Sequence, residues 1–134
     1  MADRYFTPDE ASELLPAVRR LVKRMVRHRR ALTRALERQE RLRGAVTSNG
    51  GGIPVREPAD AQAEVETAAS EVARCIDGIH ELGVLVKDVD RGLVDFPALR
   101  DGEEVFLCWQ LGEDEIAYWH GIDEGFAGRK ELPL

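Results

Sequence analysis

The sequence is poor in cysteine and aromatic residues and contains no long apolar run. Its 134 residues include only two cysteines, Cys75 and Cys108, and aromatic side chains make up 6%. Because a membrane-spanning helix needs about 20 consecutive apolar residues, we expect no membrane partner. The first residues lack a basic stretch leading into an apolar one, so we expect no secretory signal. These absences predict a cytoplasmic protein with two reduced thiols rather than a disulfide.

Length and charge predict one soluble domain with two oppositely charged parts. A chain of 134 residues can bury enough apolar surface to fold without a metal or a disulfide. The net charge is −6, but residues 1–58 carry 13 basic against 7 acidic residues, whereas residues 59–134 carry 6 against 18. This asymmetry favours either a basic surface for an acidic partner or two parts of one molecule that attract each other.

Two segments have the three-and-four spacing of apolar residues that is typical of long amphipathic helices. The first, at 7–43, is basic and begins with a capping box at Thr7. Residues 44–58 are rich in glycine and predict a flexible connection. The second segment, at 59–82, is acidic and is followed by Gly83. Two such helices in sequence predict a long antiparallel, coiled-coil-like hairpin.

After Gly83 the apolar residues alternate instead of following a helical period. Short β-branched and aromatic runs at 84–86, 92–96, 105–109 and 116–119 are separated by Asp and Gly turns. Residues 125–129 contain too much glycine for regular structure. We therefore expect residues 83–134 to form a small antiparallel β-meander and C-terminal loop, packed at the open end of the hairpin. The expected fold class is α+β, with residues 1–134 in a single domain.

The C-terminal part contains an ordered series of motifs that resembles one known family. The motifs are GLVDFP at 92–97, LCW at 107–109, YWH at 118–120 and GFAGR at 125–129, with YFT at 5–7 ahead of them. With these motifs the chain resembles the prokaryotic domain of unknown function 2203 family over nearly its whole length. The resemblance implies a helical hairpin followed by a short β region, and it implies no activity.

Five polar residues set among the predicted strands form the main candidate site: Asp95, Cys108, Glu113, His120 and Arg129. A thiolate, an imidazole and carboxylates could ligate zinc, or Cys108 and His120 could act as nucleophile and base. The chain has no CxxC, HExxH, nucleophile-elbow or phosphate-loop motif to support either chemistry. A cysteine flanked by apolar residues in a strand is more often an inert buried thiol. We therefore expect no cofactor and no metal, and retain Asp95, Cys108, Glu113 and His120 as candidate catalytic residues.

The aromatic residues of the last third offer a second candidate surface, which includes Trp109 and Trp119. Packing of a small sheet on the helices explains most of these side chains. If alternation leaves one tryptophan facing outward, it would anchor a ligand or a partner. The glycine-rich segment before Arg129 could likewise hold an anion with its backbone N–H groups, although a terminal loop is the simpler interpretation.

A row of arginines repeats every seven residues along the first helix: Arg20, Arg27, Arg34 and Arg41. In heptad geometry this face points away from the contact with the second helix. Such a row suits phosphate recognition, a solvated face, or contact with an acidic surface of a protein or of a second copy. The isoelectric point of 5.1 and the lack of aromatic residues on this face argue against nucleic acid.

The first helix carries more apolar surface than one partner helix can cover. Val26 and Leu36 widen its apolar arc, which predicts a homo-oligomer, most simply a dimer. The leading hypothesis is a cytosolic, non-enzymatic interaction or structural module that self-associates. One alternative is a small enzyme or metal-binding protein with its site in the C-terminal sheet. The other is nucleic-acid binding through the arginine row.

Overall fold

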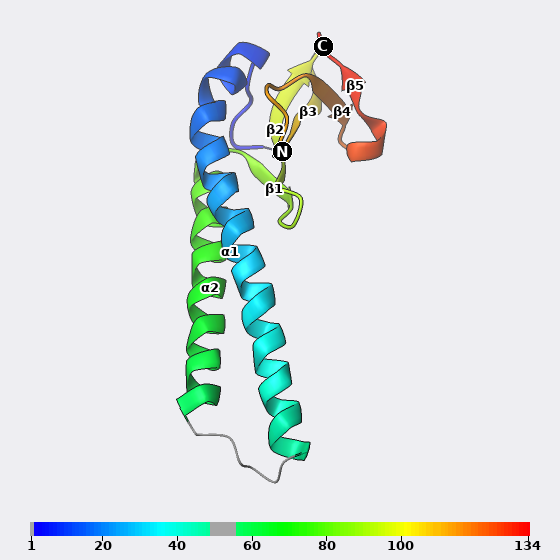
Figure 1. The fold of residues 1–134 in the computed structure, drawn as a ribbon. Coiled ribbons are helices and arrows are strands. Elements are labelled where there is room, and N and C mark those ends of the chain that lie inside the picture. The colour runs from blue at the N-terminus through cyan, green and yellow to red at the C-terminus, as the bar shows by residue number, and fades with distance from the viewer. Residues whose placement is uncertain (1, 49–55) are drawn as a thin grey trace.

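The protein consists of a long helical hairpin with a five-stranded sheet packed beside one end of it (Figure 1). The computed structural model describes residues 2–48 and 56–134. Its elements are, in chain order, α1 (Pro8–Ser48), α2 (Arg56–Glu81), β1 (Leu85–Asp88), β2 (Leu93–Arg100), β3 (Glu103–Gln110), β4 (Tyr118–Gly121), the short 3₁₀ helix η1 (Phe126–Gly128) and β5 (Lys130–Glu131). The α+β class and the helical hairpin followed by an antiparallel sheet are confirmed.

Both helices extend beyond the ends that the sequence predicted. The expected capping box forms: the Thr7 amide donates to Glu10 Oε1 at 2.9 Å, and the Glu10 amide donates to Thr7 Oγ1 at 3.1 Å. α1 continues to Ser48 instead of ending at 43, and α2 begins at Arg56 instead of 59. Pro58 does not prevent the earlier start, because in the first turn its missing N–H has no helical partner to lose. The rest of the predicted connection, residues 49–55, lies outside the described residues.

Each strand of the sheet pairs antiparallel with its neighbour in sequence, in the order β1-β2-β3-β4-β5. Two pairings position the candidate site: Asp95 of β2 lies opposite Cys108 of β3, and Phe106 of β3 lies opposite His120 of β4. The sequence predicted four strands, and β5 was missed because two residues are too few to show an alternation. The segment at 125–129, expected to be irregular, contains η1.

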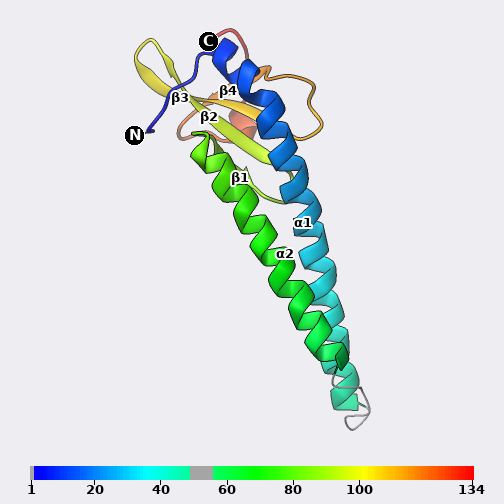
Figure 2. The same cartoon turned by 90° about the vertical axis from the view of Figure 1, so that its left-hand side faces the viewer.

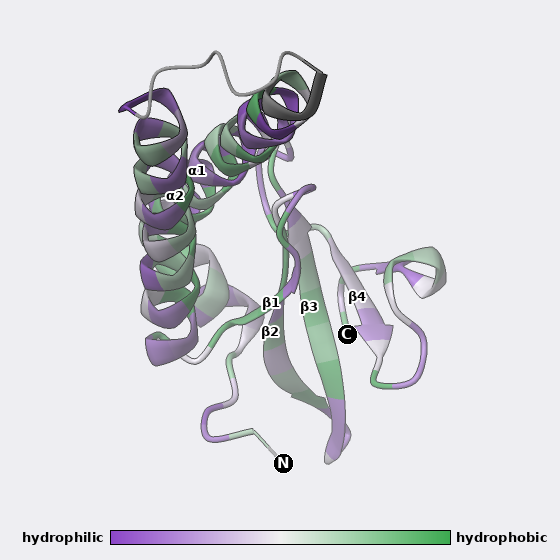
Figure 3. Ribbon diagram, turned by 90° about the horizontal axis from the view of Figure 1, so that it is seen from below, coloured by the Kyte–Doolittle hydropathy of each residue, from purple (hydrophilic) through white to green (hydrophobic). Residues whose placement is uncertain are grey.

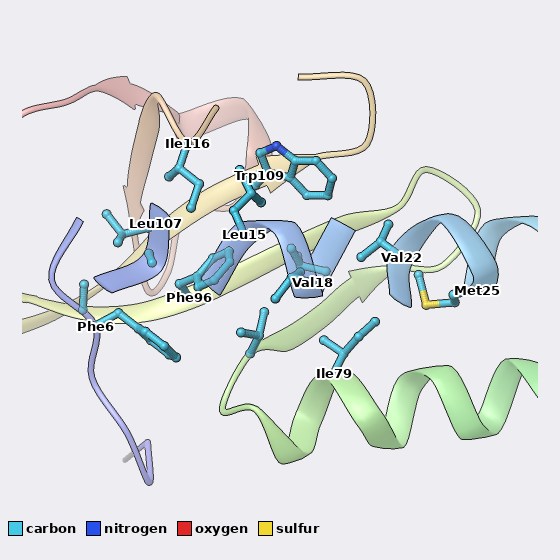
Figure 4. Packing of buried hydrophobic residues seen from close by; sticks show 14 of the residues in the cluster. Phe6, Leu15, Val18, Val22, Met25, Ile79, Phe96, Leu107, Trp109 and Ile116 are labelled. Carbon is cyan, nitrogen blue, oxygen red and sulfur yellow. The ribbon is translucent and has the colours of Figure 1, made fainter. Parts of the chain in front are cut away.

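The core lies between one face of the sheet and the hairpin (Figure 3). In Figure 4 the side chains of α1 and α2 and those of β2 and β3 meet in one cluster. The Phe6 ring packs edge-on against Phe96, with centroids 5.4 Å apart. The Phe6 amide also donates to the Pro97 carbonyl at 2.7 Å, which fixes the segment before α1 to β2. The largest fully buried side chains are Trp109, Phe96, Met25, Ile79 and Leu107.

The two residues from which self-association was predicted have different environments. Val26 is only 3% exposed, because the turns at Gly92 and Leu111 pack against it. Its expected role in an interface between copies is therefore wrong, since the chain covers it with its own sheet. Leu36 is 43% exposed. The hairpin end that carries the C-terminal part of α1 extends past the sheet (Figure 2). Within the described residues, no helix has the length and apolar character to cross a membrane.

Candidate functional site

Strand alternation places three of the candidate residues on the face of the sheet that points away from the hairpin, here called the outer face. Asp95 comes from β2, Cys108 from β3 and His120 from β4. The side chains of β2 and β3 on either side of them, such as Phe96 and Leu107, point into the core instead. One ligand atom from each of the three residues lies within 4.8 Å of the other two. The cluster is closed to solvent, with Asp95 2%, Cys108 0% and His120 3% exposed.

The imidazole of His120 is held between a carboxylate and the backbone. Its Nε2 lies 3.1 Å from both carboxylate oxygens of Asp95, and its Nδ1 lies 2.8 Å from the Gly121 carbonyl oxygen. The Gly125 amide also points at Nδ1, at 3.4 Å, but the contact with the Gly121 carbonyl is much shorter. Because a carbonyl oxygen only accepts, we assign the proton to Nδ1. Nε2 then faces two acceptor oxygens. A proton between Nε2 and Asp95, or a cation that both bind, would satisfy these atoms.

The thiol of Cys108 is unsuited to nucleophilic catalysis. Burial, followed by the neighbouring Asp95 carboxylate, raises its pKa to about 12, so the sulfur stays protonated at neutral pH unless a cation binds it. The nearest partners of the two His120 nitrogens are Asp95 and Gly121, so the imidazole is not arranged as a base for Cys108. With the sulfur fully buried, a substrate has no access to it. The geometry therefore favours a ligand role over the nucleophile–base alternative.

The other two candidate residues, Glu113 and Arg129, lie directly beside this cluster. Arg129 Nη2 donates to Glu113 Oε1 at 2.7 Å and to the Cys108 carbonyl at 3.2 Å. Glu113 Oε1 also accepts the Gln110 amide at 2.7 Å. The positive charge of Arg129 lowers the pKa of the Cys108 thiol, against the larger effect of burial. The structure therefore brings all five candidate residues into one neighbourhood, with Arg129 and Glu113 supporting the strand that carries Cys108.

Comparison with known families agrees with the resemblance noted in the sequence. The model of the uncharacterized conserved proteins DUF2203 matches residues 4–132. The chain belongs to the DUF2203 family. No curated protein and no solved structure matches the sequence. The family description names no activity.

Two residues of the DUF2203 protein that the sequence did not single out close the outer face. The ammonium of Lys87 lies 4.6 Å from the centre of the Phe106 ring, and the guanidinium of Arg91 lies 4.4 Å from that of Phe126. Arg91 also donates to Gln110 at 2.9 Å. Both cations come from β1 and the turn after it. The sequence alone did not indicate this role for Lys87 and Arg91, because basic residues are common on edge strands, where they prevent aggregation.

The two tryptophans do not form an exposed binding surface in the DUF2203 protein. Trp109 points into the core at 0% exposure, and its Nε1 donates to the Glu113 carbonyl at 3.1 Å. Trp119 is half-buried on the same side of the sheet and packs against the core. The guanidinium of Arg100 and the ammonium of Lys130 lie 4.9 and 4.8 Å from its ring centre. A partner at Trp119 would therefore first have to displace two cations of the same chain.

The arginine row lies on the exposed side of α1. The side chains of Arg20, Arg27, Arg34 and Arg41 are all exposed. Within the described residues none of the four has an ion pair closer than 4.0 Å, whereas Arg38, which faces α2, pairs with Glu64 at 2.6 Å. Arg34 and Arg41 also line a groove that carboxylates of α2 border, but within the described residues neither arginine is within 4.0 Å of a carboxylate.

Proposed function

We propose that this DUF2203 protein is a non-enzymatic metal-binding protein that holds a divalent transition metal between Asp95, Cys108 and His120. The observation that carries the proposal is the convergence of three different donor atoms, one from each of three adjacent strands, within 4.8 Å at a buried site. A sulfur, an imidazole nitrogen and a carboxylate oxygen form a ligand set suited to zinc. This proposal departs from the expectation of no metal, which rested on the absence of familiar spacing motifs.

The charge of the buried cluster supports a divalent cation. A thiolate and a carboxylate carry two negative charges, and a neutral imidazole adds none, so a divalent ion makes the set neutral. Buried charges are stable only when they are paired or coordinate a metal. The Glu113–Arg129 pair next to the cluster is neutral by itself.

The surroundings of His120 also fit a metal ligand. A coordinating histidine usually donates its other ring N–H to a carboxylate or a backbone carbonyl, which fixes the tautomer and the ring orientation. The Gly121 carbonyl, 2.8 Å from Nδ1, is placed to accept that bond and to leave Nε2 for the ion. The metal would replace the proton between His120 and Asp95, and it would remove the proton from Cys108 despite the raised pKa of that thiol.

The closed position of the site supports a binding role rather than catalysis. Three protein ligands leave one tetrahedral position, but all three ligating side chains are at most 3% exposed. A metal here would link β2, β3 and β4 into one unit. Since the proposed site needs a reduced Cys108, we place the protein in the cytoplasm.

Metal binding can be tested with cobalt, whose thiolate complexes absorb in the near ultraviolet. Metal-free protein titrated with Co²⁺ is expected to show this band at one equivalent and to lose it when Zn²⁺ is added. Zinc at 100 times its Kd should stabilise the fold by about 2.7 kcal/mol. Cys108→Ala should abolish the band, whereas the matched control Cys75→Ala, at the buried cysteine of α2, should keep it.

The outcome for the wild-type protein decides the proposal even if a variant does not fold. Folded wild-type protein that shows no thiolate band, no bound metal by elemental analysis and no thermal shift with Zn²⁺ contradicts it. A band that persists in Cys108→Ala and disappears in Cys75→Ala would place the metal elsewhere. Asp95→Asn, which keeps the volume of the side chain, provides a second test of the ligand set.

A second function, self-association, is favoured by the far half of the hairpin. A groove of about 610 Å³ lies there, and alanines such as Ala31, Ala35 and Ala63 form part of its lining. Cations of α1 and carboxylates of α2 border the same groove, so a second hairpin packed antiparallel would meet opposite charges. We infer a coiled-coil-like dimer through this surface. Ala31→Glu, on the lining of this groove, should yield a monomer by sedimentation equilibrium at micromolar concentration, while the control Leu99→Glu, at an exposed leucine of β2, should not. A monomeric wild-type protein contradicts the dimer.

A further inference from the structure

A second concave surface lies on α1, away from the proposed metal site, and is called here the basic groove. It has a volume of about 370 Å³ and is lined by Lys23, Val26, Arg27, Arg30, Arg34 and Leu111. Four of the six lining residues are cations and none is acidic. The apolar floor comes from Val26 of α1 and from Leu111, which follows β3.

The four cations are arranged in a line. Lys23, Arg27, Arg30 and Arg34 follow one another at steps of four, three and four residues, which is the repeat of a single helix face. At 1.5 Å per residue they span about 16 Å along α1. Arg20 and Arg41 continue the row at its two ends and lengthen it to about 30 Å. The groove therefore presents about one positive charge per helical turn between Lys23 and Arg34, whereas beyond it the exposed Glu37 lies on the same face, between Arg34 and Arg41.

The chain does not neutralise these charges itself. Within residues 2–48 and 56–134, none of the four lining cations has an ion pair closer than 4.0 Å or a ring contact. The neighbouring Arg29 and Arg38, in contrast, pair with Asp90 at 3.0 Å and with Glu64 at 2.6 Å. Asp90 and Glu64 thus pair with other arginines of α1, and the cations of the basic groove have no ion-pair partner among the described residues.

We propose that the basic groove binds the phosphate backbone of double-stranded nucleic acid without reading its sequence. A linear row of cations matches a linear row of phosphates, and planar guanidinium groups suit phosphate oxygens in particular. Proteins that bind single strands place aromatic side chains under the bases, and the lining of this groove contains none. A duplex offers its phosphates without requiring stacking, so it is the form that these residues fit.

The net charge of −6 does not prevent such binding, because salt screens charges beyond about 10 Å at 0.1 M. The four nearby cations therefore determine the electrostatic potential that a phosphate experiences at the groove. This inference goes beyond the metal-binding proposal and does not depend on it, since none of the groove residues is a proposed metal ligand.

The test is fluorescence anisotropy with a labelled 20-base-pair duplex of mixed sequence, measured from 50 to 200 mM salt. Four phosphate contacts predict a slope of log K against log salt of about −3.6, which means that affinity falls about 100-fold over this range. Arg27→Gln combined with Arg30→Gln should reduce the slope by about two and weaken binding at 50 mM salt at least 10-fold. The control carries Arg56→Gln and Arg74→Gln, which remove the same charge from exposed positions of α2 and should bind as the wild type does.

Three results would overturn the proposal. The first is that wild-type protein, at 100-fold molar excess over the duplex and 50 mM salt, does not bind it. The second is equal affinity of the groove variant and the control variant. The third is tighter binding of the single strand than of the duplex. If the groove variant instead changes only the sedimentation of the protein, the cations contact an acidic surface of a second copy. Helical content by circular dichroism verifies that both variants, which change exposed residues, remain folded.

Discussion

The guanidinium of Arg129 lies 2.7 Å from the Glu113 carboxylate, so the loop around η1 is tied to the turn after β3. The two side chains are 13% and 27% exposed, which makes this the more buried of the two ion pairs near the C-terminus. The same guanidinium lies 4.2 Å from the Tyr118 ring and 4.6 Å from the Phe126 ring. Arg129 thus joins three segments of the outer face next to Cys108.

Replacing Arg129 should destabilise the fold substantially. Arg129→Ala leaves Glu113 without its partner and removes two ring contacts, so we expect a loss of about 2–4 kcal/mol. The neighbouring Lys130→Ala breaks an exposed pair with Glu124 and should cost under about 1 kcal/mol. Urea unfolding of metal-free protein measures both values. Equal losses for the two variants would show that the partial burial of Arg129 contributes nothing.

Substitutions at Gly92 and Gly102 distinguish the cost of backbone strain from the cost of a steric clash. Gly92 and Gly102 both have positive φ, +66° and +82°, but an added Cβ at Gly92 would lie 2.9 Å from Leu111 Cβ and Val22 Cγ1, whereas Gly102 faces open space. Gly102→Ala should cost about 1–2 kcal/mol from strain. Gly92→Ala should cost about 1–3 kcal/mol more because the turn must move away from α1. Chemical denaturation measures the free energy of unfolding of both variants. Equal losses would mean that the turn is not packed on α1.

The two thiols should be inert in the native protein. Burial raises the pKa of Cys75 as well as that of Cys108, for which the value is about 12. At pH 8, metal-free native protein is therefore expected to react with a disulfide reagent orders of magnitude more slowly than a free thiol. Two thiols should appear once guanidinium unfolds the chain. Rapid reaction of one thiol in native wild-type protein but not in Cys108→Ala would show that the outer face is open.

The capping box of α1 should make stability depend on pH in the acid range. Hydrogen bonds from the Thr7 amide and hydroxyl lower the pKa of Glu10. A lowered folded-state pKa means that the ionised carboxylate stabilises the fold above its unfolded pKa and that this is lost as pH falls through the folded value. The stability difference between wild type and Glu10→Gln should hold from pH 7 down to the unfolded pKa of a glutamate, about 4.3, and shrink as the pH falls further. Urea titrations at four pH values test this, and a constant difference contradicts it.

The pairing of Asp95 with Cys108 could be predicted from the sequence, but the position of His120 could not. Asp101 and Gly102 connect β2 and β3, and with φ of +53° and +82° they form the two-residue turn that Asp-Gly favours. Such a turn fixes the register, and counting back from it sets residue 95 opposite 108. The connection from β3 to β4 is longer and allows several registers, so only the structure shows that His120 reaches Asp95.

The basic groove depended on packing that no local pattern encodes. The periodicity located both helices, yet it could not tell that Val26 is covered by the turns at Gly92 and Leu111. That covering is also what gives the basic groove its floor. The arginine row was visible in the sequence, whereas its lack of partners became evident only when Arg38 and Glu64 were seen to pair.

The nearest-neighbour order of the strands has a consequence for how the molecule reaches its native state. Every pairing from β1 to β5 joins adjacent segments, so the sheet can grow hairpin by hairpin with little loop-closure entropy. The bond from the Phe6 amide to Pro97 spans most of the chain and cannot form until α1 docks. Docking of α1 on the sheet therefore closes a much longer loop than any strand pairing does.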